Sequence, residues 1–176
     1  MNYSTARRKI YSGHLLAWSH RAWGSWYDVK IQAVRAFTQS EYCHVGVAWN
    51  VGGRIFALEA VLAGVRIFPL SRMLPFYHIP VPVKWTTDVE AWALAQVGQP
   101  YSQWQAIKAG LGLLKAGEDS IFQCAEYAQE VLRRGGVDLK CDATPAALVT
   151  AAMSAGSPAW AIEADVPSQQ LRKEPQ

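Results

Sequence analysis

A chain of 176 residues has the length of a single domain, and with 51% apolar residues it can form a hydrophobic core. Its net charge of +3 is small and no run of basic residues occurs, which argues against a nucleic-acid-binding stripe. No apolar stretch approaches the length of a transmembrane helix, no signal peptide is visible after Met1, and the three cysteines have no zinc-binding spacing.

The chain begins without a clear core element. Residues 1–10 are expected to form a loose arm, and the apolar run over residues 13–18 predicts the first strand. Residues 26–37 carry apolar side chains at helical spacing, which predicts a helix. The polar residues 38–40 then end it.

Residues 41–65 predict a β-hairpin, because two runs of β-branched and aromatic residues flank the turn sequence at 50–53. A loop of Val51-Gly52 would put His44 directly opposite Glu59, and a loop of Gly52-Gly53 would make them diagonal neighbours. Either register places both side chains on one face of the sheet, since side chains alternate with period two. A carboxylate beside an imidazole fixes the tautomer of the ring and supports its protonated form.

Further strands and helices are predicted after the hairpin. Residues 65–70 predict a strand. Residues 77–83 predict an edge strand or extended segment, because their two prolines cannot donate ladder hydrogen bonds. Helices are predicted over residues 88–98 and 102–115. His78 is expected at the surface.

The next helix is predicted over residues 121–136, with Cys124 at its start. The first N–H groups of a helix have no internal partner and its dipole is positive there, so a thiolate is stabilised. A buried structural cysteine is the common alternative, since free cysteine usually packs as a small apolar side chain. The His44–Glu59 pair favours the reactive reading, because a thiol, a base and an orienting carboxylate are the minimum set for covalent catalysis.

The last part of the chain predicts one short helix after the cap Thr144-Pro145 and a flexible tail over residues 165–176. Strands cluster in the middle of the chain and helices follow, which favours an α+β fold over alternating βαβ units. The expected organisation is an arm over residues 1–10, one domain over residues 11–164, and the tail.

Several motifs, taken in order, resemble the circularly permuted branch of the NlpC-type papain-like hydrolases, the YaeF/YiiX-like group. They are a glycine-started strand at 13–16, T-Q-S-E-Y-C-H-V-G-V at 38–47, L-E-A-V-L-A-G-V at 58–65, V-G-Q-P-Y at 97–101 and C-A-E-Y at 124–127. The resemblance spans about residues 11–150. Two positions depart from the family pattern: His14 stands where an acidic residue is common, and Ala125 where serine is common.

The resemblance implies a papain-like fold in permuted order, with a small antiparallel sheet or half-barrel packed against the nucleophile helix. It implies Cys124 as nucleophile, His44 as base and then acid, and Glu59 as the orienting group. Tyr42, Gly46 and Tyr101 are the further candidates for the oxyanion hole or for substrate binding. Tyr42 is expected to share the face of His44, with ordinary sheet packing as the alternative.

The leading hypothesis is a cysteine hydrolase that cleaves an amide bond through a thioester, with peptidoglycan stem peptides as the substrate that the resemblance implies. A lipid or ester acyl hydrolase or acyltransferase, with residues 111–114 in its groove, is the second, and an inactive binding module is the third. We expect no cofactor, no metal and no nucleic-acid partner. We expect synthesis in the cytoplasm, with delivery to a cell wall by a phage, a virion or a secretion apparatus.

Overall fold

The computed structural model describes residues 1–19, 42–61, 63–99 and 122–165 of the chain. Within them, six strands form one sheet in the order β4-β3-β2-β1-β5-β6, and every neighbouring pair is antiparallel. The strands are β1 (Leu15–Ser19), β2 (Tyr42–Val51), β3 (Arg54–Val61), β4 (Gly64–Pro69), β5 (Phe76–Ile79) and β6 (Trp160–Ile162). The predicted α+β class is confirmed.

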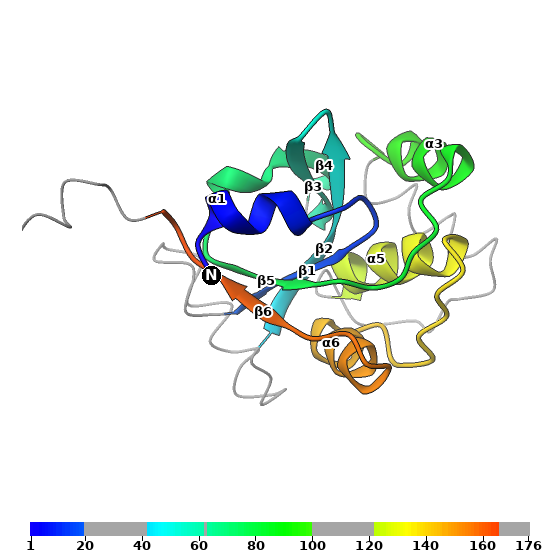
Figure 1. Cartoon of the computed structure of the whole chain (residues 1–176). Coiled ribbons are helices and arrows are strands. Elements are labelled where there is room, and N and C mark those ends of the chain that lie inside the picture. Colours follow the sequence, from blue (N-terminus) through cyan, green and yellow to red (C-terminus); the bar gives the residue numbers. More distant parts are fainter. Residues whose placement is uncertain (20–41, 62, 100–121, 166–176) are drawn as a thin grey trace, which may run out of the picture.

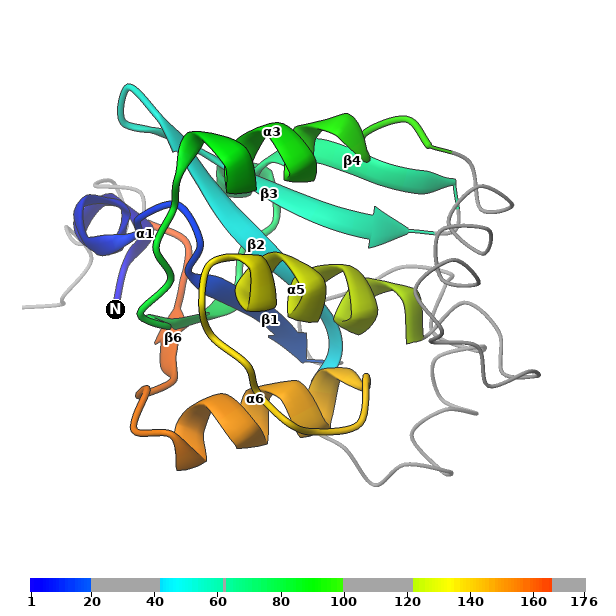
Figure 2. The same ribbon diagram turned by 90° about the vertical axis from the view of Figure 1, so that its right-hand side faces the viewer.

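Helices cover both faces of this sheet (Figures 1 and 2). The longer helices α3, α5 and α6 contribute to the core on one face, and the short helix α1 and the 3-10 turn η3 contribute to the core on the other. None of the helices in the described part of the chain has both the length and the apolar character needed to cross a membrane. The bounds are α1 (Tyr3–Ala6), η1 (Arg7–Lys9), η3 (Leu70–Arg72), α3 (Thr87–Ala95), α5 (Phe122–Arg134) and α6 (Pro145–Ser154).

The sheet divides the hydrophobic core into two layers. Leu15 and Ala17 of β1 pack with α5 and α6 in what we call the helix-side core. Leu16 and Trp18 point the opposite way and pack with α1 in the arm-side core. Because successive side chains of a strand point to opposite faces, a strand covered on both sides must be apolar throughout. This explains why β1 is a continuous apolar run in the sequence.

The β2–β3 hairpin adopts the second of the two registers considered above. Val51 pairs with Arg54 and Val47 pairs with Leu58, so the loop is Gly52-Gly53. Both glycines have positive φ, of 56° and 82°, which the tight hairpin turn requires. Continued by one residue, this register puts Glu59 opposite Gly46, so His44 is the diagonal neighbour of Glu59.

The expectation of a loose arm over residues 1–10 is wrong. These residues form α1 and η1, and the side chains of Tyr3, Ala6 and Ile10 are buried in the arm-side core. The backbone N–H of Tyr3 also donates to the carbonyl of Glu163, 3.0 Å away. The physical reason is that three apolar side chains spaced three and four residues apart form one face of a helical turn, which covers the sheet.

Of the two alternatives for residues 77–83, the edge strand is wrong. Strand β5 pairs with β1 on one side and with β6 on the other, so it lies inside the sheet. The strand ends at Ile79, and the two prolines lie beyond it, where no ladder bond is required of them. Strand β6 has only three residues and gave no signal of alternating hydrophobicity in the sequence.

The remaining predicted helices agree with the described part of the chain. The side-chain oxygen of Thr86 accepts a hydrogen bond from Val89 at the start of α3, and that of Thr144 accepts one from Ala147 at the start of α6. Gly136 after α5 has a φ of 86°, as expected for a helix stop. The helices predicted over residues 26–37 and 102–115, and the tail beyond residue 165, lie outside the described residues.

His78, expected at the surface, is 1% exposed and lies against His14. Nε2 of His78 is 2.8 Å from Nδ1 of His14, which also accepts the backbone N–H of Tyr11 at 3.3 Å. Nδ1 of His14 therefore accepts twice, so His78 carries its proton on Nε2. Burial lowers the pKa of both histidines to about 4, and the charge of His14 acts further on His78.

Acid should therefore weaken the fold through this pair. The unfolded chain takes up a proton on each histidine near pH 6.5, whereas the folded chain resists protonation until about pH 4, so stability falls between these values. We expect His78→Gln, which keeps a donor but does not titrate, to lose less stability than the wild type between pH 6.5 and 4.5 in urea unfolding. Parallel losses in the two proteins would contradict this expectation.

Candidate active site

Three predicted residues meet where the first described turn of α5 lies near β2 and β3. His44 comes from β2, Glu59 from β3 and Cys124 from α5. The helix is held against these strands by apolar packing in the helix-side core, to which Cys124 itself belongs. The positions of the three residues thus depend on the packing of α5, because they lie far apart in the sequence.

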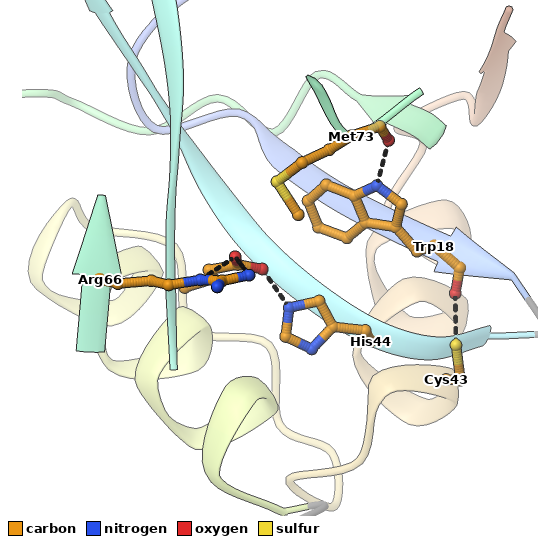
Figure 3. Close-up of polar contacts among 6 residues, drawn as sticks. Trp18, Cys43, His44, Arg66 and Met73 are labelled. Atoms are coloured by element: carbon orange, nitrogen blue, oxygen red, sulfur yellow. Dashed lines mark hydrogen bonds and ion pairs between the residues drawn. The ribbon is translucent and has the colours of Figure 1, made fainter. Parts of the chain in front are cut away.

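Glu59 is a fully buried carboxylate between two cationic side chains. Figure 3 shows His44 and Arg66 reaching toward each other from β2 and β4, and the Glu59 carboxylate binds both. Its Oε2 accepts a hydrogen bond from Nε2 of His44, and its Oε1 accepts from Nε of Arg66 at 2.7 Å. Burial alone would raise the pKa of Glu59, but the bonds and charges of His44 and Arg66 outweigh it and lower that pKa.

The His44 ring is held by a chain of contacts on one side. Its side chain is 17% exposed and packs on the indole of Trp18, with ring centroids 5.3 Å apart. Trp18 is itself fully buried and its indole N–H donates to the carbonyl of Met73 at 2.8 Å (Figure 3). The orientation of His44 is therefore fixed by packing on Trp18 as well as by its bond to Glu59.

The third contact of His44 is with Cys124. Burial opposes a charge on the imidazole, but the Cys124 thiolate, its hydrogen bond to His44 and the bond to Glu59 outweigh that effect and raise the pKa of His44 to about 10. Since Nε2 is held by Glu59, Nδ1 is the nitrogen left for Cys124. A protonated His44 beside a thiolate is an ion pair that can attack a carbonyl carbon and then donate a proton.

Cys124 is 4% exposed, in the first turn described for α5. This agrees with the expected position near a helix start, where backbone N–H groups and the helix dipole favour a negative charge. Cys43 precedes His44 in β2, and its thiol donates to the carbonyl of Trp18 at 3.4 Å. Cys124 is thus the cysteine that His44 contacts, while Cys43 takes part in strand packing.

Tyr42 does not share the face of His44 as expected, because β2 bulges between the two residues. Trp18 pairs with His44, but Ser19 pairs with Tyr42, so Cys43 is skipped in the pairing. The Tyr42 ring packs edge-on against Tyr77, at 5.2 Å, on the helix-side core. Tyr101 lies outside the described residues.

Gly46 is buried inside β2, and its lack of a side chain leaves room for the site. A Cβ at this position would lie 2.9 Å from the carbonyl oxygen of Leu58, 3.2 Å from Cβ of Glu59 and 3.6 Å from the Trp18 ring. The glycine therefore allows Glu59 and Trp18 to approach His44 across the sheet.

We expect Gly46→Ala to destabilise the fold by about 1–3 kcal/mol, because the added methyl group overpacks a backbone contact that cannot move away. Urea unfolding followed by circular dichroism measures this. Ala48→Gly, on the same face of β2, is a useful comparison, because it removes a buried methyl group instead of adding one. An unchanged midpoint for Gly46→Ala would contradict the expected clash.

Sequence reasoning missed Arg66 and Trp18. Arg66 is the direct partner of Glu59 in the β3–β4 pairing. Drawing the register of that second hairpin would have shown a positive and a negative residue opposite each other, and such cross-strand pairs are favourable. Trp18 is the direct partner of His44 in the β1–β2 pairing, but residues 20–41 separate the two strands and give no short turn from which to derive the register.

Comparison with known protein-family models and with curated proteins gives no match to this chain. Among the described residues, no group of three or more histidine, cysteine, aspartate or glutamate side chains is arranged to hold a metal ion.

Proposed function

We propose that the protein is a cysteine hydrolase with a papain-like arrangement in permuted order, in which His44 precedes Cys124 along the chain. The observation that carries the proposal is that His44 hydrogen-bonds both Glu59 and Cys124. A buried carboxylate, an imidazole and a thiol in one chain of contacts form a catalytic triad. The packing of an antiparallel sheet against the helix that bears Cys124 supports the same reading.

In the first half of the reaction, the Cys124 thiolate attacks the carbonyl carbon of an amide and forms a tetrahedral intermediate. The C–N bond then breaks as the imidazolium of His44 gives its proton to the leaving amine, and a thioester to Cys124 remains. The oxyanion needs hydrogen-bond donors, and the backbone N–H of Cys124 is one candidate.

In the second half, neutral His44 takes a proton from water, and the resulting hydroxide attacks the thioester carbonyl. The C–S bond breaks, which releases the carboxylic acid and restores the Cys124 thiolate and the His44 imidazolium. Glu59 stays ionised in both halves and holds Nε2–H of His44, so that Nδ1 carries out the proton transfers.

We propose peptide amide bonds of peptidoglycan stem peptides as the substrate, on the strength of the family resemblance in the 38–47, 58–65 and 124–127 motifs. The test is incubation of the full chain with a defined muropeptide mixture, followed by mass spectrometry of the products. A gain of 18 Da distributed over two fragments is expected for hydrolysis. Parallel incubation with acyl phospholipids gives the alternative outcome, since fatty-acid release without muropeptide cleavage would replace the amide substrate by an ester.

A further inference from the structure

Arg66 binds Glu59 but has no role in the reaction proposed above. It lies directly opposite Glu59 in the β3–β4 pairing. Both its Nε and its Nη2 are 2.7 Å from the same oxygen, Oε1, while the other oxygen binds His44. The guanidinium also lies over the Phe68 ring, 4.8 Å from its centroid. Two donors and one ring contact therefore hold the guanidinium on Glu59, although the side chain is 41% exposed.

The charge of His44 changes during the proposed reaction, but the charge of Arg66 does not. His44 is an imidazolium before the amine leaves and a neutral imidazole afterwards. Glu59 is fully buried, and a buried carboxylate without a cationic partner tends to take up a proton. Arginine keeps its charge at any pH at which proteins are folded. During the thioester stage, when His44 is neutral, Arg66 therefore still places a full positive charge against Glu59.

We propose that Arg66 is a positioning residue that keeps Glu59 ionised throughout the reaction, so that His44 keeps the tautomer able to accept a proton on Nδ1. This inference rests on the proposed function, because it assigns the role through the same three residues.

The tautomer argument follows from the hydrogen bonds. With Glu59 ionised, Oε2 can only accept, so Nε2 of His44 carries the hydrogen and Nδ1 is free to take a proton from water. With Glu59 protonated, its hydroxyl can donate to Nε2, and neutral His44 then carries its hydrogen on Nδ1. In that state Nδ1, the nitrogen that faces Cys124, already carries a hydrogen and cannot accept a proton from water. A single proton on Glu59 would thus stop the second half of the reaction.

The test compares the pH dependence of Cys124 alkylation and of muropeptide hydrolysis in the wild type and three variants. Arg66→Gln removes the charge but keeps a hydrogen-bond donor, and Arg66→Lys keeps the charge without the planar pair of donors. Arg54→Gln, at the exposed hairpin turn of β3, is the matched control for the loss of one positive charge. Alkylation by iodoacetamide is assigned to Cys124 by peptide mass spectrometry, with Cys141 as the internal reference.

We expect the acid limb of both profiles to move up by about one pH unit or more in Arg66→Gln, because loss of an adjacent cation raises the pKa of a carboxylate. Arg66→Lys should restore most of the wild-type profile, and Arg54→Gln should leave it unchanged. Circular dichroism and urea midpoints establish that each variant is folded over the pH range used, which separates a shift in profile from a loss of protein.

Two other outcomes overturn the inference in distinguishable ways. In the first outcome, Cys124 of the wild type is alkylated and the wild type hydrolyses muropeptides, but Arg66→Gln keeps the wild-type pH profile. Arg66 then has no positioning role. If Arg66→Gln proves unfolded, Arg66→Met decides, since it also removes the charge but keeps the apolar stem of the side chain. A folded Arg66→Met with a shifted acid limb supports positioning, and an unshifted limb refutes it. If wild-type Cys124 is alkylated no faster than Cys141 at neutral pH, the proposed function itself fails, and this inference fails with it.

Discussion

Replacing Cys124 with alanine is expected to lower hydrolysis by on the order of 10^5-fold or more, because no other group can form the thioester. The side chain is almost fully buried and contacts His44, so the variant loses that contact and stability within the usual range of about 0.5–3 kcal/mol for one substitution. The fold should therefore survive. Turnover of the muropeptide mixture, measured together with the circular dichroism spectrum, tests both parts of the expectation.

Cys141→Ala is the matched control for this experiment. Cys141 is a partly buried cysteine in the loop before α6, and its thiol lies 3.9 Å from the side-chain nitrogen of Gln129. Removing it deletes the same atom type from the neighbourhood of the same helix. We expect full activity in this variant. Equal activity in Cys124→Ala and Cys141→Ala would reject Cys124 as the nucleophile.

Replacing Glu59 with alanine is expected to destabilise the fold by about 3 kcal/mol, at the lower end of the range for breaking a buried ion pair. His44 is left with a positive charge in a largely buried position and without its carboxylate partner. Arg66 is 41% exposed and can turn toward water, so its contribution to the loss is small. The free energy of unfolding in urea at pH 7 measures the effect.

The pH dependence of unfolding gives a second readout of the same residue. Since the folded state lowers the pKa of Glu59 below 4.5, the stabilisation by Glu59 is present above that value and is lost as the pH falls through the folded pKa. Glu59→Gln, which keeps the shape and an acceptor, should lose less stability than Glu59→Ala and should flatten this part of the curve. Equal curves for wild type and Glu59→Gln would show that Glu59 is not an ionised partner of His44.

His44 acts at the other end of the pH range. Its pKa is raised to about 10, so its ion pairs stabilise the fold fully below pH 6.5 and are lost as the pH rises toward 10. The stabilising effects of Glu59 and His44 are therefore both fully present between pH 4.5 and 6.5. The His14–His78 pair also stabilises the fold, and this effect is lost as the pH falls from 6.5 toward 4. The stability of the protein therefore declines further on the acid side of this range.

Local sequence signals were sufficient for most of the elements. The Gly52-Gly53 turn, the cap Thr144 and the stop at Gly136 act over a few residues, so their effects can be derived without the rest of the molecule. The pairing of His44 with Glu59 could be predicted for the same reason, because a two-residue turn sets the register of the whole hairpin. The contact of His44 with Cys124 was expected from the resemblance to a known family.

The missed features depend on contacts between distant segments. The burial of Tyr3, Ala6 and Ile10 depends on a face of the sheet that only the assembled fold provides. The burial of His78 depends on β6, a strand of three residues that pairs with β5 late in the chain. The bulge at Cys43 arises where β1 ends against β2, and neither strand alone predicts it. Side-chain pattern alone therefore predicts β1 to β5 but, apart from the β2–β3 hairpin, not which strands pair with one another.

The border of the sheet at β6 is closed by the first residues of the chain. The amino group of Met1 donates to the carbonyl of Ala161 at 3.0 Å, and Glu163 donates to the carbonyl of Met1 at 2.9 Å. An uncovered outer strand offers unpaired N–H and C=O groups to other molecules and invites edge-to-edge aggregation. Loss of the contacts that these residues make with β6 would uncover this border, and we expect it to promote self-association.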